Sequence, residues 1–170
     1  MTDFAMQTKA KGNTDEWLTP ESAVYPLVPW LKENSTIWCP FDKADSAFFT
    51  VLSKQFKVIA THIDTGNDFF ETNVEECDYI ISNFPYSLRM PIFERLFKLH
   101  KPFAMLCNYA GLWDSKQRFE WFKKYGIELL ILKGRTKFRR IGESGKDSSP
   151  LFQSIYVCHN VLPKNIVYEK

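Results

Sequence analysis

The sequence has few cysteines, and none of them forms a C-x-x-C pair of the kind that structural zinc sites use. Its four cysteines are widely spaced, and three lie in apolar runs, where cysteine usually serves as a small core residue. They are Cys39, Cys77, Cys107 and Cys158. We therefore predict buried free thiols, no metal site and a reducing compartment.

Long apolar runs are also missing. No segment reaches the roughly 18 consecutive apolar residues of a membrane-spanning helix, and residues 1–12 contain no apolar stretch like a signal peptide. These absences predict a soluble, cytoplasmic protein with no membrane partner.

Positive charge is in small excess, and the net charge is +2. The chain is therefore not a basic nucleic-acid clamp by overall charge, and contact with nucleic acid needs a local patch. One stretch provides such a patch, and we predict its cations to contact phosphates. The cations are Lys133, Arg135, Lys137, Arg139 and Arg140, followed by Lys146. A solvated strand face is the alternative for the same residues.

Apolar and aromatic residues, in contrast, are plentiful. The chain of 170 residues is 45% hydrophobic and holds 15 Phe, 7 Tyr and 5 Trp, which argues against disorder. Its length favours one domain, 1–170, with one sizeable core. We expect residues 1–13 to be loosely ordered and residues 142–149 to form a flexible loop.

Strand and helix patterns alternate along most of the chain. Strands are predicted at 35–41, 57–62, 78–82, 103–107 and 127–132, and helices after Thr19 and at 45–56, 91–100 and 115–125. Such alternation predicts an α/β fold, a parallel sheet with helices on both faces. The segments 136–141 and 152–159 have no helix between them, so we expect them to pair as an antiparallel hairpin.

The tetrapeptide Asn83-Phe84-Pro85-Tyr86 follows the predicted strand 78–82 directly. The Asn83 side-chain oxygen and the Phe84 carbonyl can each accept a hydrogen bond from an exocyclic NH2 group. Pro85 fixes the turn by restricting its own φ and the conformation of Phe84. Tyr86 can stack on a planar base. These four residues are therefore the predicted catalytic group.

Five short motifs occur in a characteristic order between about Trp17 and Cys158. They are Thr19-Pro20, Cys39-Pro40-Phe41-Asp42, His62-Ile63-Asp64, Asp68-Phe69-Phe70 and Asn83-Phe84-Pro85-Tyr86. Their order and spacing resemble those of the S-adenosylmethionine-dependent adenine-N6 DNA methyltransferases, in particular the small phage-type members.

This resemblance implies a Rossmann-like class I methyltransferase fold, a seven-stranded mostly parallel sheet that ends in an antiparallel hairpin. It implies methyl transfer from S-adenosylmethionine to adenine N6 in DNA, with a possible protein partner for target recognition. Residues that match the family's cofactor motifs are Thr19, Pro20, Cys39, Pro40, Asp42, Asp64, Asp68 and Phe69.

The chain departs from the family pattern in three places. Residues 39–47 contain none of the glycines usual in the first cofactor loop, His62 stands where the family places a ribose-binding acid, and Phe84 replaces a proline. Because of the glycine-free loop, a non-catalytic protein that binds nucleic acid or a host protein is an alternative. RNA adenine and a protein amide are alternative acceptors.

Several motif residues also have purely structural interpretations. Thr19 and Asp45 could cap helices, Asp68 could cap a helix or form a turn, and Asp64 could be a solvated loop acid. Trp113, Trp121 and Phe122 lie at helix-like positions and are expected in the core rather than as base-stacking platforms.

Overall fold

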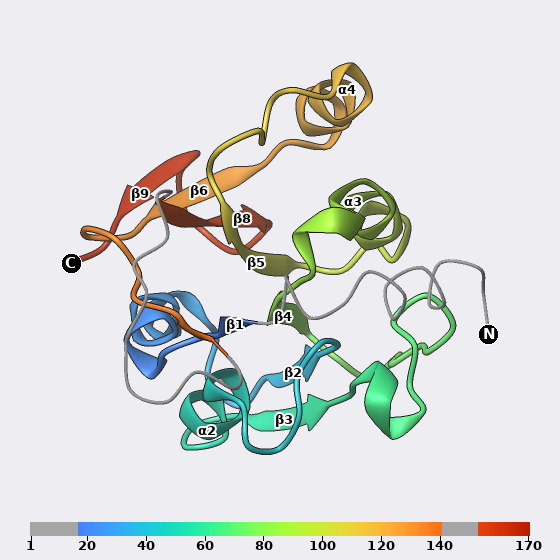
Figure 1. Cartoon of the computed structure of the whole chain (residues 1–170), viewed down its shortest axis with the longest axis vertical. Coiled ribbons are helices and arrows are strands. Elements are labelled where there is room, and N and C mark those ends of the chain that lie inside the picture. The colour runs from blue at the N-terminus through green and yellow to red at the C-terminus, as the bar shows by residue number, and fades with distance from the viewer. Residues whose placement is uncertain (1–16, 141–152) are drawn as a thin grey trace.

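The computed structural model describes residues 17–140 and 153–170. Seven strands form one sheet in the order β3-β2-β4-β5-β8-β6-β9, and two short strands, β1 and β7, pair separately. Figure 1 shows the sheet running through the molecule. The strands are β1 (Trp17–Leu18), β2 (Thr36–Cys39), β3 (Lys57–Ala60), β4 (Tyr79–Asn83), β5 (Phe103–Asn108), β6 (Glu128–Ile131), β7 (Arg139–Arg140), β8 (Ser154–His159) and β9 (Ile166–Tyr168).

The helices are short and several begin at side-chain caps. Ser46 accepts from the Phe49 backbone and starts one, and Ser115 accepts from the Arg118 backbone and starts another. The α-helices are α2 (Ala47–Leu52), α3 (Arg89–Lys98) and α4 (Lys116–Tyr125), and the 3₁₀-helices are η1 (Glu21–Ala23), η2 (Tyr25–Trp30), η3 (Ile63–Thr65) and η4 (Tyr86–Leu88).

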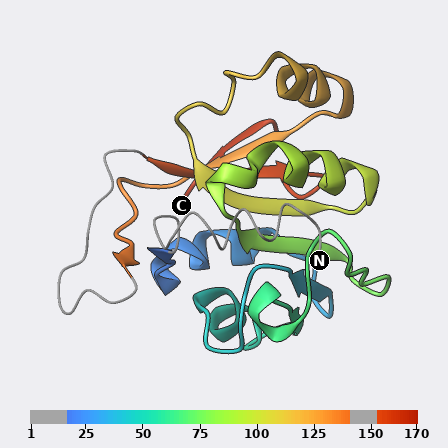
Figure 2. The same cartoon turned by 45° about the vertical axis from the view of Figure 1, so that its right-hand side comes forward.

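Apolar layers cover both faces of the sheet. On one face, η1, η2 and α2 bury side chains such as Leu27 and Phe48 against β4 and β8. On the other, α3 and α4 bury Phe93 and Phe122 against β5. Figure 2 shows the sheet between these two sets of helices. The predicted arrangement of helices on both faces is confirmed.

The strand order reverses at one point. The chain passes from β2 outward to β3, and then crosses back so that β4 pairs with β2 on its other side, with all three strands parallel. In open α/β sheets, the crevice at such a switch point, at the carboxyl ends of the strands, is where ligands bind. The ends of β2 and β4 meet there.

The predicted fold class is confirmed: the chain has a Rossmann-like α/β fold with a seven-stranded, mostly parallel sheet and antiparallel pairing near its end. The prediction that 136–141 and 152–159 pair with each other is wrong, because each pairs with a different strand. β8 lies between β5 and β6 and is antiparallel to both, whereas β7 pairs with β1. Apolar β8 gains burial on both faces in the sheet centre, which a surface hairpin would not give.

Two predicted helix caps are also wrong. Pro20, not Thr19, is the cap residue of η1, and Ser46 rather than Asp45 caps α2. A hydroxyl one residue closer to the helix satisfies the Phe49 N–H, so Asp45 is left exposed. The predictions for residues 1–13 and 142–149 lie outside the described residues.

All four cysteines are buried free thiols, as predicted. Within 17–140 and 153–170, no helix has the length and apolar character that crossing a bilayer requires. The same ranges contain no cluster of three or more His, Cys, Asp or Glu side chains suited to a metal ion.

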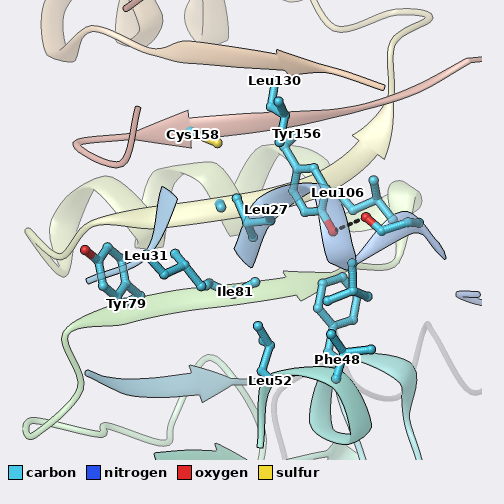
Figure 3. Close-up of a cluster of buried hydrophobic side chains, with 14 of the residues drawn as sticks. Leu27, Leu31, Phe48, Leu52, Tyr79, Ile81, Leu106, Leu130, Tyr156 and Cys158 are labelled. Atoms are coloured by element: carbon cyan, nitrogen blue, oxygen red, sulfur yellow. Dashed lines mark hydrogen bonds between the residues drawn. The ribbon is translucent and has the colours of Figure 1, made fainter. Parts of the chain in front are cut away.

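A buried hydroxyl joins the sheet to the helices of one face. Tyr156 of β8 donates to the Ala23 carbonyl of η1 over 2.8 Å, and both groups lie inside the apolar layer (Figure 3). Burial raises the pKa of the Tyr156 phenol well above its usual range, so it stays protonated as a donor.

We expect Tyr156→Phe to lower the free energy of unfolding by about 1–3 kcal/mol, because the buried Ala23 carbonyl loses its partner. Urea denaturation measures the effect. Tyr25→Phe is the matched control, since the Tyr25 hydroxyl donates to Glu21 at an exposed position and its loss should cost less than about 0.5 kcal/mol. Equal effects of the two substitutions would contradict the assignment.

Candidate functional site

Asn83 is the last residue of β4 and reaches the switch point described above. Its side-chain nitrogen donates to Thr19 Oγ1 over 3.1 Å. Its side-chain oxygen, Oδ1, is buried and has no hydrogen-bond partner among the described residues. Buried acceptors are nearly always paired, and an unpaired one costs about 1–3 kcal/mol. The site therefore holds a fixed acceptor that a ligand donor could satisfy.

The rest of the predicted catalytic group forms a stiff turn beyond Asn83. Pro85 has φ −60° and ψ 115° and leads into η4. Phe84 is only 3% exposed, and its ring meets those of Tyr86 and Phe93 edge to face at 5.8 and 5.7 Å. The core thus anchors Phe84, which in turn supports the partly exposed ring of Tyr86.

Arg89 lies over Tyr86 from the following helix. Its guanidinium carbon is 5.8 Å from the centre of the Tyr86 ring. Two of its nitrogens donate to the carbonyls of Asn108, the last residue of β5, and of Ala110 just beyond it. The Tyr86 ring therefore contacts both Phe84 and a guanidinium that is itself fixed to the neighbouring strand.

Asp42 lies in the glycine-free loop after β2. Its side chain is 7% exposed and accepts a short hydrogen bond from Ser82 Oγ, and its backbone nitrogen donates to the Thr61 carbonyl over 3.1 Å. One residue thus joins the carboxyl ends of β2, β3 and β4. Its carboxyl group is turned inward, so it binds the protein's own strands rather than facing solvent.

Burial raises the pKa of the Asp42 carboxyl to about 6, while hydrogen bonds from Ser82 and Ser46 oppose the rise. Ionising the Asp42 carboxyl therefore costs free energy in the folded protein. The hydrogen bond between Asp42 and Ser82 lies directly beside Asn83 in the sequence.

The predicted cofactor residues fall into two groups. Four are buried, namely Cys39, Pro40, Asp42 and Phe69, and the Phe69 ring packs on Trp38 and Phe41 at 5.6 and 4.9 Å. The others are partly or well exposed, namely Thr19, Pro20, Asp64 and Asp68. The cofactor role of all eight residues stays a prediction.

The carboxylates of Asp64 and Asp68 already have partners within the protein. Asp64 forms an ion pair with Lys43 at 2.7 Å, and Asp68 Oδ1 accepts from the Phe70 backbone over 2.9 Å in a turn. His62 Nδ1 accepts from the Asp64 backbone and so begins η3. Asp64 follows β3 on the same edge of the sheet as Asn83, as the sequence suggested.

The cationic segment, residues 133–140, is connected to Asn83 through β1. Its end forms β7 and pairs with β1 in the register Leu18 opposite Arg139 (Figure 2). Thr19, the next residue, holds the Asn83 amide. Lys133, Arg135 and Lys137 are exposed. The predicted nucleic-acid segment is therefore tied through β1 to the predicted catalytic residue, although the contact itself stays a prediction.

The sequence interpretation missed two aromatic residues beyond β5. Tyr109 is 55% exposed, and Trp113, expected in the core, is 43% exposed although its ring meets Phe122 at 5.4 Å. Phe122 itself is buried, as predicted. Tyr109 directly follows a buried strand, in the same relation that Phe84 bears to β4, and this placement is the signal that could have identified it.

The raised pKa of Asp42 predicts a pH-dependent stability. The folded carboxyl keeps its proton to about pH 6, whereas an unfolded one loses it near pH 4. The contribution of the Asp42 carboxyl to the free energy of unfolding is therefore largest below pH 4. It falls as the pH rises from 4 to 6, and it stays constant above pH 6. Relative to wild type, Asp42→Asn should gain up to about 3 kcal/mol in unfolding free energy between pH 4 and 7.

Denaturant titrations at several pH values measure this difference. Asp45→Asn, at an exposed position three residues away, is the matched control and should show almost no gain. A wild-type-to-Asp42→Asn difference that stays flat from pH 4 to 7 would contradict the burial of a costly carboxylate.

Comparisons with known proteins found one kind of likeness, in the overall fold. No protein-family model matches the chain, and no curated protein matches it either. Among solved structures it is similar to a precorrin-6y C5,15-methyltransferase from Geobacter metallireducens GS-15, with 12% sequence identity and a TM-score of 0.47, over 86% of this chain and 93% of that one. This is a faint likeness of overall fold.

Proposed function

We propose that the protein transfers a methyl group from S-adenosylmethionine to the exocyclic N6 amine of adenine in DNA. The observation that carries the proposal is the buried Oδ1 of Asn83 at the carboxyl end of β4, which has no hydrogen-bond partner within 17–140 and 153–170. The ordered motifs around it support the choice of adenine and of the cofactor, because they resemble those of the adenine-N6 methyltransferases.

Asn83 would act on the acceptor amine. The lone pair of an adenine NH2 is delocalised into the ring, which makes the nitrogen a poor nucleophile. A hydrogen bond from this amine to Oδ1 draws electron density onto the nitrogen and favours a pyramidal geometry. It also stabilises the positive charge that grows on the nitrogen during transfer, and the bond to Thr19 holds the amide in place for this.

Tyr86 would hold the base. Aromatic stacking on a nucleobase is worth roughly 1–3 kcal/mol, which offsets much of the few kcal/mol needed to take a base out of a duplex. The ring is already supported by Phe84 and Arg89, so little conformational freedom is lost on binding.

The residues at the switch point fit S-adenosylmethionine in part. The carboxylates of Asp64 and Asp68, in the chain that follows β3, could accept hydrogen bonds from ribose or adenine groups. Thr19 contacts Asn83, and Pro20 follows it. Asp42 and Phe69 are turned into the protein and would contact the cofactor at most through their backbone. When bound, the cofactor supplies an electrophilic methyl group on a sulfonium sulfur.

The cationic segment would supply the phosphate contacts. Its exposed Lys133, Arg135 and Lys137 lie on the chain that runs into β7, and β7 is tied to Thr19 and Asn83 through β1. A nucleic-acid strand that follows these cations would pass near Asn83, which favours nucleic acid over a protein amide as substrate.

A second candidate function is a non-catalytic protein of the same fold that binds nucleic acid or a host protein. The inward Asp42 side chain in a glycine-free loop favours it. Isothermal titration with S-adenosylmethionine separates the two: micromolar binding supports the enzyme, and no binding at millimolar cofactor supports the non-catalytic protein.

Asn83→Ala should lower the rate of labelled methyl transfer to DNA by about 100- to 1,000-fold, because the transition state loses a charge-stabilising acceptor. Cofactor affinity should change little. Asn83→Asp is the matched control, since it keeps an oxygen acceptor and should retain part of the activity. Full activity of Asn83→Ala would remove the proposed mechanism, and transfer only to RNA or protein would change the substrate.

The triple variant of Lys133, Arg135 and Lys137 to Gln should weaken DNA binding at low salt and reduce the slope of log affinity against log salt by about 2–3. Filter binding at several salt concentrations measures the slope. A control triple variant of Lys32, Lys57 and Lys164 to Gln removes the same charge near the amino ends of β2, β3 and β9. Equal slopes in both variants would exclude a specific role for the cationic segment.

A further inference from the structure

Tyr109 lies at the same edge of the sheet as the acceptor site. β4 and β5 are parallel neighbours, with Asn83 opposite Leu106, and Tyr109 follows Leu106 by three residues. Its side chain is 55% exposed. A large aromatic ring thus lies in solvent just beyond the strand next to the one that ends in Asn83.

Hydrogen bonds from two arginine side chains hold the loop that carries Tyr109. Arg89 donates to the carbonyls of Asn108 and Ala110, and Arg118 donates to those of Gly111 and Leu112 over 2.5 and 2.6 Å. The Arg118 residue is 4% exposed, and burial lowers the pKa of its guanidinium. Four backbone carbonyls of this short segment thus accept from two guanidinium groups, which together fix one loop conformation.

Gly111 shows the same constraint. Its φ is +70°, and a Cβ atom there would lie 3.1 Å from Asp114 Oδ2 and 3.4 Å from Arg89 Nη1. The conformation and the close approach of Arg89 both favour glycine. Tyr109 is therefore presented from a rigid backbone, while its own ring is left exposed.

Arg89 also joins this loop to the base-stacking residue, because it lies over the Tyr86 ring while it binds the carbonyls on either side of Tyr109. The positions of Tyr86 and of the Tyr109 backbone are thus coupled through one side chain. An exposed, pre-positioned ring of this kind suits stacking against a flat ligand, since binding fixes few additional torsions.

We propose that Tyr109 stacks on a nucleobase adjacent to the target base. The proposal rests on the nucleic-acid acceptor proposed above. A base that leaves the stack exposes the faces of its neighbours, and a second ring near Asn83 can cover one of them. Since the cationic segment is tied to Asn83 through β1 and Thr19, a bound strand would meet both phosphate contacts and an aromatic contact near Asn83.

Fluorescence anisotropy with labelled single-stranded oligonucleotides that contain adenine, without cofactor, tests the proposal directly. Tyr109→Ala should weaken binding roughly 5- to 150-fold, and Tyr109→Phe should bind like wild type because stacking needs the ring and not the hydroxyl. Tyr168→Ala removes a ring that is 69% exposed on edge strand β9 and should have no effect. Wild-type affinity of Tyr109→Ala would overturn the proposal.

Abasic oligonucleotides provide a readout that a structural role for Tyr109 would not move. An abasic nucleotide placed directly 5′ or 3′ of the target adenine should weaken binding to wild type at one of these two positions and leave the affinity of Tyr109→Ala unchanged there. Equal losses in both proteins at both positions would contradict stacking by Tyr109.

The outcomes separate this inference from the proposed function. If wild type transfers methyl groups to DNA but Tyr109→Ala binds normally, the inference fails and the function stands. If the Tyr109 effects on binding appear but no methyl transfer is found, the proposed enzyme fails and the nucleobase contact stands. If wild type binds no nucleic acid, both the acceptor class and the contact are excluded.

Discussion

A buried amide oxygen, at the end of a strand in the middle of a sheet and with no partner in the part of the chain that the structure describes, is the constraint on which this account depends. Proteins rarely leave such an acceptor unsatisfied, because it has lost its water and gained nothing in return. The Asn83 amide cannot simply turn toward solvent, since Thr19 holds its nitrogen and Phe84 is anchored in the core directly beyond it. Among residues 17–140 and 153–170, the acceptor is therefore left available to a ligand donor.

The surrounding architecture positions that acceptor. The reversal of strand order brings the ends of β2 and β4 together, and Asp42 joins both to the end of β3 through Ser82 and Thr61. The loop after β2 contains no glycine, and the Asp42 carboxyl group turns inward there, so the loop is held by the protein's own strands. Under the proposed function, S-adenosylmethionine would therefore rely more on Asp64, Asp68 and the Thr19 segment.

Much of the fold could be predicted from the sequence, because apolar periodicity marks strands such as 103–107 and helices such as 91–100. Pairing partners could not, since β8 and β7 look like a hairpin locally, and only competition for the buried centre of the sheet places β8 between β5 and β6. For the site, the tetrapeptide at 83–86 was recognisable from residue types. The inward turn of Asp42 and the burial of Phe69 depend on tertiary packing and carry no local signal, whereas the position of Tyr109 directly after a buried strand could have identified it.

The most direct measurement of the central claim is a crystal structure of the protein with S-adenosylhomocysteine and a short oligonucleotide that contains adenine. The account predicts the adenine N6 nitrogen about 2.7–3.2 Å from Asn83 Oδ1, with the base against the Tyr86 ring. A structure in which Oδ1 is bonded to another protein group, with the base bound away from the end of β4, would contradict it.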